Sequence, residues 1–163
     1  MKRIAVCGSD AGLSRRAEEI AEIVGRGIAK RNAVLVCGGR GGVMEAASRG
    51  AKGANGLTVA MIPGESSSEA NQFVEIALPT SLGKMRNFLV VRAADAVIGI
   101  AGRWGTLSEI SMALNLAIPV VIIQGTGGVS DWLSTKPIEF DGVGYSVASD
   151  PEDALDLAFR LSG

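Results

Sequence analysis

Short apolar runs alternate with helix-like segments along almost the whole sequence. The apolar runs, expected as strands, are Ile4–Cys7, Val34–Val36, Leu57–Ile62, Ala96–Ile100 and Pro119–Ile123. Buried strands that are separated by helices indicate a parallel sheet covered on both faces. The sequence therefore predicts an α/β fold, a three-layer α/β/α domain with a mostly parallel sheet, formed by residues 1–163 as one unit.

The remaining elements follow from caps, spacing and turn residues. The expected helices run from an N-cap at Ser14 to about Arg31, over Val43–Ala51, Gly83–Ala94 and Thr106–Ala117, and onward from Asp150 and Pro151. Two short strands are expected at Val74–Ala77, whose place in the sheet stays open, and at Tyr145–Ala148. Loops are expected at Glu65–Asn71 and Gly125–Gly128, and the segment around Trp132 has no clear pattern.

Composition excludes several classes of function. The net charge is −1 and the basic residues are scattered, so nucleic-acid binding is not expected. No run approaches the roughly 18 apolar residues of a membrane span, and the first residues do not form a signal peptide, so we expect a cytoplasmic protein. The chain has no histidine, which removes histidine-activated nucleophiles and histidine metal sites, and we expect no metal and no resident cofactor. Cys7 and Cys37 are expected as buried thiols rather than as a disulfide.

Three glycine loops follow expected strands, at Gly8–Gly12, Gly38–Gly42 and Gly99–Gly105. Ligands of open parallel sheets bind at the carboxyl ends of strands, where the strand order reverses. If the order is 3-2-1-4-5-6, Ile4–Cys7 and Ala96–Ile100 flank that reversal and their loops face each other across one crevice. None of the loops is a GxGxxG dinucleotide motif or a Walker motif, so these two classes of nucleotide site lose support.

The third loop carries the sharpest prediction. Gly102-Arg103-Trp104-Gly105-Thr106 joins an apolar strand to a helix, and Glu109 follows in the expected first turn. Glycines let the backbone approach an anion, and the free N–H groups of a helix start favour a phosphate. The segment therefore predicts a site that holds a phosphate and presents a carboxylate, although a glutamate in a first turn is also common for dipole reasons alone.

Several side chains have both a functional and an ordinary interpretation. Ser9, with Asp10, could bind sugar hydroxyls or cap the next helix, and Trp104 could stack on a base or cover its turn. Arg40 lies within a glycine loop and is a candidate for a phosphate contact, whereas Arg92 is expected to be a solvated helix residue.

The motifs together resemble a known superfamily. They are Val6-Cys7-Gly8-Ser9, Cys37-Gly38-Gly39-Arg40-Gly41-Gly42-Val43-Met44, Met85-Arg86-Asn87 and the segment Gly102–Glu109. The chain resembles the Rossmann-like superfamily of Lonely Guy-type phosphoribohydrolases and molybdenum cofactor carrier proteins, long labelled "possible lysine decarboxylases". The resemblance extends from Ile4 to about Val121 and is strongest to a short, uncharacterised branch near the carrier proteins.

The resemblance implies roles for particular residues. The phosphoribohydrolases release the base and ribose 5-phosphate from nucleoside 5′-monophosphates, and Arg86 and Glu109 match the residues implicated in that catalysis. Gly105 and Thr106 match the turn that holds the phosphate in those relatives. With the candidates from the three glycine loops, the predicted ligand-binding and phosphate-binding residues are Gly8, Ser9, Gly38, Gly39, Arg40, Gly41, Gly102, Arg103, Trp104, Gly105 and Thr106.

The sequence also departs from the family motifs. The motif PGGxGTxxE begins here with Ala101-Gly102-Arg103 in place of Pro-Gly-Gly. Arg86-Asn87 replaces the usual Arg-Lys pair, and Glu45 stands where the hydrolases tend to have a small residue. Arg103 could also pair with Glu109 and neutralise it. These departures weaken the case for hydrolysis more than the case for phosphate binding.

Three functions stay open at this point. The chain is expected to bind a nucleotide or related phosphorylated ligand with no reaction established, to be a nucleoside-monophosphate phosphoribohydrolase, or to carry a phosphorylated pterin cofactor without catalysis. Lysine decarboxylation is disfavoured. The resemblance also implies a homo-oligomer, a dimer or tetramer, which pairs through the segment with Met85, Phe88 and Leu89.

Overall fold

The computed structural model describes all 163 residues and is built on one seven-stranded sheet. Its strands lie in the order β4-β3-β2-β1-β5-β6-β9, and every neighbouring pair is parallel. The strands are β1 (Arg3–Gly8), β2 (Val34–Cys37), β3 (Thr58–Ile62), β4 (Ile76–Pro79), β5 (Ala96–Ile100), β6 (Val120–Ile123) and β9 (Ser146–Ala148). Without β4, the other six strands follow the predicted order 3-2-1-4-5-6, and β4, whose place stayed open in the sequence, forms the outer edge beside β3.

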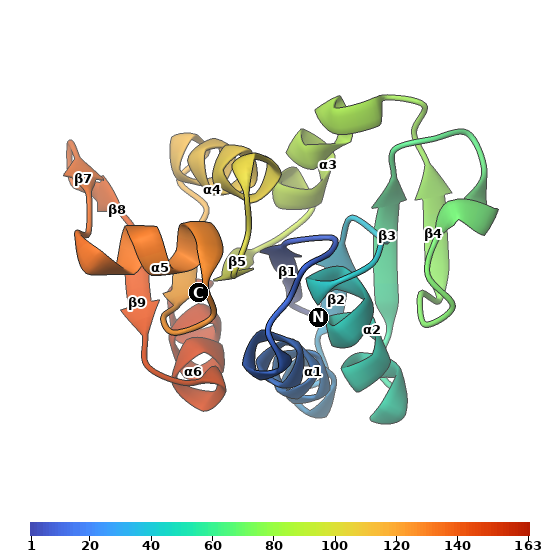
Figure 1. Ribbon diagram of the computed structural model, residues 1–163, viewed down its shortest axis with the longest axis horizontal. Coiled ribbons are helices and arrows are strands. Elements are labelled where there is room, and N and C mark those ends of the chain that lie inside the picture. Colours follow the sequence, from blue (N-terminus) through green and yellow to red (C-terminus); the bar gives the residue numbers. More distant parts are fainter.

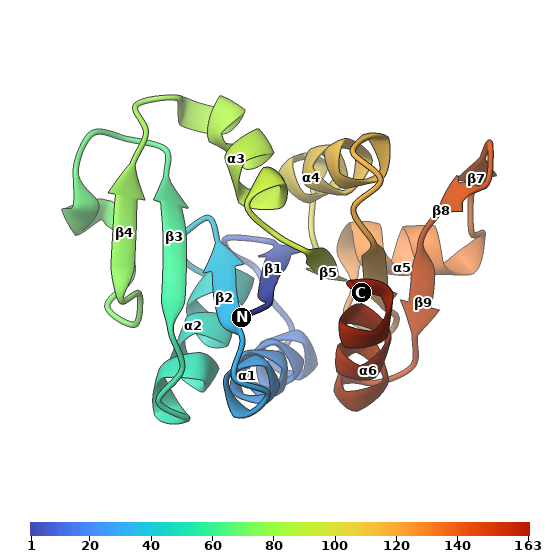
Figure 2. The same ribbon diagram turned by 180° about the vertical axis from the view of Figure 1, so that it is seen from behind.

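Helices cover both faces of this sheet, as the alternating pattern predicts. They are α1 (Arg15–Lys30), α2 (Val43–Gly53), α3 (Asn87–Arg92), α4 (Trp104–Asn115), α5 (Gly128–Thr135) and α6 (Pro151–Leu161). Helices α1, α2 and α6 lie on one side, with α3 and α4 on the other (Figures 1 and 2). The three-layer α/β/α fold with a parallel sheet is therefore confirmed.

Two apolar cores explain the layers. Ile4, Val6 and Ile98 face α1, α2 and α6 from one side of the sheet, and Ala5 and Val97 face α3 and α4 from the other. Neighbouring residues of a strand thus enter different cores, which is why the strands are apolar without alternation. The expected caps are confirmed: Ser14 accepts a hydrogen bond from the N–H of Ala17, and Asp150 accepts one from that of Asp153.

Several element boundaries differ from the sequence prediction. The expected helix Gly83–Ala94 is split into the 3₁₀ turn η2 (Gly83–Arg86) and the short α3. Helix α4 begins at Trp104 rather than at Thr106, so Glu109 lies in its second turn and not in its first. The expected strand Val74–Ala77 is shifted to Ile76–Pro79 because Asn71 still holds the preceding turn, accepting at its carbonyl from Val74 and at its side chain from Phe73.

Four small elements were not expected. The 3₁₀ turn η1 (Ser67–Glu69) interrupts the polar loop, and α5 forms from the segment around Trp132. Strands β7 (Glu139–Phe140) and β8 (Val143–Gly144) form an antiparallel hairpin outside the main sheet. None of the helices has the length and hydropathy needed to cross a membrane.

Candidate functional site

A cleft of about 440 Å³ opens beyond the carboxyl ends of β1 and β5, at the point where the strand order reverses. Thirteen residues line it, and most of them are polar. They are Gly8, Ser9, Asp10, Met44, Lys84, Arg86, Asn87, Arg103, Trp104, Gly105, Thr106, Ser108 and Glu109. The loops after β1 and β5 thus meet at one crevice, as the predicted strand order requires.

The start of α4 forms one wall of this cleft. Its N-cap residue, Arg103, has extended backbone, and no side chain caps the helix, in contrast to α1 and α6. The first intrahelical hydrogen bond comes from the N–H of Leu107 to the carbonyl of Arg103. The N–H groups of the first three helical residues, Trp104 to Thr106, are therefore available to an anion, and the helix dipole favours negative charge there.

The turn before α4 is held in a strained conformation. Ala101 has a φ of 52° and Gly102 a φ of 102°, both in the left-handed region. The N–H of Ala101 donates to Thr126 Oγ1 at 2.8 Å, and its carbonyl accepts from Ser130 Oγ at 2.8 Å. A Cβ on Gly102 would lie 2.5 Å from Cβ of Thr106, so this glycine also lets the turn close against α4.

Arg86 lies at the floor of the cleft and is only 8% exposed. Its Nη1 donates to Asn87 Oδ1 at 2.5 Å, and its Nη2 donates to the carbonyl of Gly38 at 3.2 Å. Its Nε is buried and has no hydrogen-bond partner. A Cβ on Gly38 would lie 2.5 Å from Arg86 Nη2, so this glycine makes room for the guanidinium.

Glu109 faces Arg86 across a gap of 3.8 Å between Oε1 and Nη1, and it is 6% exposed. Burial raises the pKa of Glu109 from 4.5 to about 7, while Arg86 and a hydrogen bond with Cys7 act to lower it. Burial also raises the pKa of the Cys7 thiol well above its usual value. The structure thus brings together the two residues that the family resemblance singles out, with the carboxylate buried beneath the cleft.

The remaining predicted residues divide into two groups. Gly8, Ser9, Arg103, Trp104, Gly105 and Thr106 line the cleft, and Gly102 lies in the turn beside it. Gly38, Gly39, Arg40 and Gly41 do not line it. Arg40 instead forms an ion pair of 3.1 Å with Glu69 of the turn η1.

Two expected interactions are corrected. Arg103 does not pair with Glu109; its Nη2 donates to the carbonyl of Ala11 at 3.0 Å, since its place at the N-cap directs it toward the loop after β1. In the structure, Ser9 neither caps α1 nor stays free: its Oγ accepts from the N–H of Gly102 at 3.0 Å and joins two of the glycine loops.

Sequence reasoning missed three polar residues of the cleft, Lys84, Asn87 and Ser108. The Nδ2 of Asn87 donates to Ser108 Oγ at 3.3 Å and to the carbonyl of Gly105 at 3.5 Å, so Asn87 joins α3 to the start of α4. Its position beside Arg86 was the available signal. No group of three or more metal-ligating side chains lies together.

Comparison with known proteins places this geometry in a family. The model of the SLOG cluster4 family matches residues 1–153. The chain belongs to the SLOG cluster4 family. A protein of unknown function from Archaeoglobus fulgidus is 44% identical over 143 residues, which cover 88% of this chain and 85% of that protein.

Several solved structures are similar to this SLOG cluster4 protein in fold and sequence. The protein TM1055 has a TM-score of 0.89 and 33% identity, with 98% of this chain and 99% of that chain covered. A molybdenum cofactor binding protein from Rippkaea orientalis has a TM-score of 0.85 and 32% identity, with 99% and 98% covered. The molybdenum cofactor carrier protein from Chlamydomonas reinhardtii has a TM-score of 0.84 and 28% identity, with 99% and 98% covered. These similarities confirm the resemblance to the Lonely Guy and cofactor carrier group.

Proposed function

We propose that this SLOG cluster4 protein binds a phosphorylated small molecule, either a nucleoside 5′-monophosphate or a pterin cofactor, with its phosphate at the start of α4. The observation that carries the proposal is an uncapped helix start that opens into the same cleft as a buried arginine with an unpartnered Nε. A buried donor without a partner is rare in proteins, and an anion in the cleft would supply negative charge beside it. The relatives named for binding or carrying the molybdenum cofactor support a ligand of this chemical kind.

Retention of the ligand is favoured over its cleavage. A phosphoribohydrolase needs a carboxylate that reaches the ribose or activates water. Here Glu109 is buried and faces Arg86. Burial raises the pKa of its carboxyl to about 7, so the group is mostly protonated below neutral pH. The protein is therefore proposed to bind its ligand without rapid hydrolysis of the N-glycosidic bond, which fits a carrier or a sensor better than a hydrolase.

The test compares AMP with adenosine by calorimetric titration, followed by chromatography for free adenine. The parent protein is expected to bind AMP, to bind adenosine at least tenfold more weakly, and to release no adenine at an enzyme-like rate. Equal binding of AMP and adenosine would contradict the phosphate site. Adenine release that disappears in Glu109→Gln would show that the protein is a hydrolase.

A matched pair of glycine variants locates the site. A Cβ on Gly105 would meet only Asn87 Nδ2, at 3.7 Å, so Gly105→Val is expected to fold and to obstruct the anion position. Gly53 lies at the end of α2, where an added Cβ would have nothing within 4 Å, and Gly53→Val serves as the control. We expect Gly105→Val to weaken AMP binding at least tenfold and Gly53→Val to leave it unchanged.

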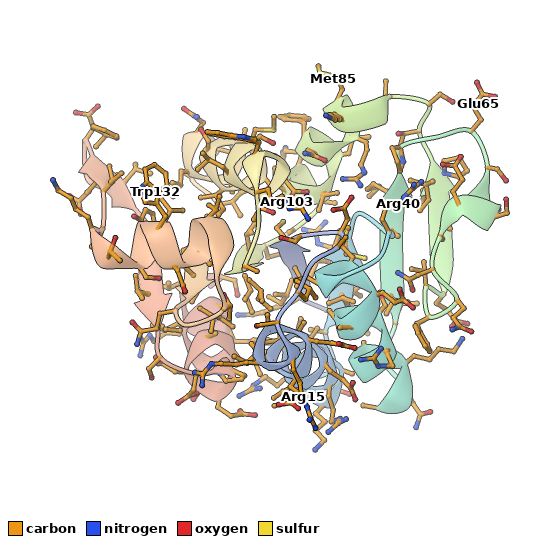
Figure 3. The ribbon with its side chains drawn as sticks, in the orientation of Figure 1. Arg15, Arg40, Glu65, Met85, Arg103 and Trp132 are labelled. Carbon is orange, nitrogen blue, oxygen red and sulfur yellow. The ribbon has the colours of Figure 1, made fainter.

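The protein is also proposed to form a homo-oligomer through the surface of η2 and α3. Met85 and Phe88 are exposed there, and Met85 points away from the body of the molecule (Figure 3). Sedimentation of the parent and of Met85→Glu tests this: the parent is expected to sediment as a dimer or tetramer and the variant as a smaller species. A monomeric parent at micromolar concentration would refute it.

A further inference from the structure

A second, apolar groove of about 400 Å³ lies on the other side of the α4 start from the polar cleft. Its walls are Trp104 and Leu107 on α4 and Val129 and Trp132 on α5. The backbone of Gly102 and Gly128 also lines it. The groove therefore begins at the turn that is proposed to hold the phosphate.

Both tryptophans of the chain lie in this groove, and neither is part of the core. Trp104 is 83% exposed and Trp132 is 61% exposed. Figure 3 shows Trp132 on α5, on the side next to α4. A large aromatic side chain left in water contributes little to the stability of the fold, whereas exposed aromatic surface beside a binding site provides a stacking platform.

The groove and the polar cleft share Arg103 and Trp104. A phosphate at the start of α4 would thus have two neighbouring spaces for the rest of its ligand. Beyond these two shared residues, the cleft presents Lys84, Arg86 and Glu109, whereas the groove presents the indole of Trp132 and two aliphatic side chains. The apolar faces of a heteroaromatic ring are matched by the groove and not by the charged cleft.

We infer that the planar heteroaromatic ring of the phosphorylated ligand occupies the groove between Trp104 and Trp132, rather than the space above Glu109. This inference rests on the proposed function and adds the position and class of the ring. It also accounts for retention of the ligand, because the bond between ring and sugar then lies on the opposite side of the α4 start from the Glu109 carboxyl.

The two tryptophans make the test direct, because Trp104→Phe and Trp132→Phe each leave one fluorescent reporter. AMP is expected to quench the fluorescence of both variants, and inorganic phosphate to cause little quenching. Trp132→Ala and Trp104→Ala are each expected to weaken AMP binding about tenfold, since stacking on an aromatic side chain contributes on that order. Inorganic phosphate, measured by competition, should bind the alanine variants as it binds the parent.

Phe140→Ala is the matched control, because Phe140 is another exposed aromatic residue but lies outside this groove. It should leave AMP binding unchanged, and circular dichroism should show that all variants are folded. If Trp132→Ala binds both AMP and phosphate as the parent does, the ring site is wrong and the phosphate site stands. If the parent binds neither, the proposed function fails as well. A Trp132→Ala variant that loses only self-association would assign the groove to a second copy of the chain and overturn the inference.

Discussion

The buried Glu109 predicts an unusual dependence of stability on pH. Its pKa is 4.5 in the unfolded chain and about 7 in the folded protein, where burial disfavours the charged form. Between these two values the folded state holds one more proton than the unfolded state. The free energy of unfolding therefore falls as pH rises from about 4.5 to 7, and it levels off above that range. The whole loss amounts to about 3 kcal/mol.

Glu109→Gln removes the titrating group and keeps the shape of the side chain. Urea unfolding of parent and variant at intervals from pH 5 to 8 should show the variant gaining stability relative to the parent, by most of that roughly 3 kcal/mol. Glu75→Gln, at an exposed glutamate, should show no such change. Asp95→Asn should likewise differ from the parent by a constant amount over this range. The hydrogen bond from Arg3 lowers the pKa of Asp95 below its ordinary value of 3.8, so its contribution is lost only in more acidic solution. A constant difference between parent and Glu109→Gln across this range would refute the reasoning.

Two further substitutions test the packing of the site. Gly38→Ala should destabilise the protein by about 1–3 kcal/mol and weaken AMP binding, because its Cβ would displace the Arg86 guanidinium, whereas Gly53→Ala should be neutral or stabilising by up to about 1 kcal/mol; thermal melts and AMP titrations check both. Ala101→Pro restores the proline of the family motif, yet it should cost at least about 3 kcal/mol, since proline cannot adopt a φ of 52° and would lose the N–H that donates to Thr126. A normal urea midpoint for Ala101→Pro would show that the turn has another backbone.

The sheet and its layers were predictable because they depend on features that the sequence displays directly. Ile98 and Val97 are both apolar because the two faces of β5 meet different helices. Ser14 and Asp150 mark helix starts by capping chemistry. The position of β4 was harder, because Asn71 fixes the preceding turn through contacts with the carbonyl groups of Gly39 and Arg40, far away in the sequence.

The parts of the candidate site that depend on backbone conformation were predictable. The hydrogen-bond and ion-pair partners of its long side chains were less so. The glycine turn before α4 predicted a helix directly after it from the sequence alone, with a start two residues later than the observed one at Trp104. The partners of Arg40 and Arg103 were not predictable, because each long side chain reaches an atom supplied by another loop, Glu69 and the carbonyl of Ala11. Trp132 gave no signal, since α5 has neither a side-chain cap nor a clear apolar stripe.

The central claim is that a phosphate binds at the start of α4, and the amide signals of that turn test it most directly. In a ¹⁵N-labelled sample titrated with AMP, the largest amide shifts are expected at Trp104, Gly105 and Thr106, with smaller shifts when adenosine is used instead. Shifts confined to other parts of the chain, or the same shifts from adenosine as from AMP, would contradict the claim.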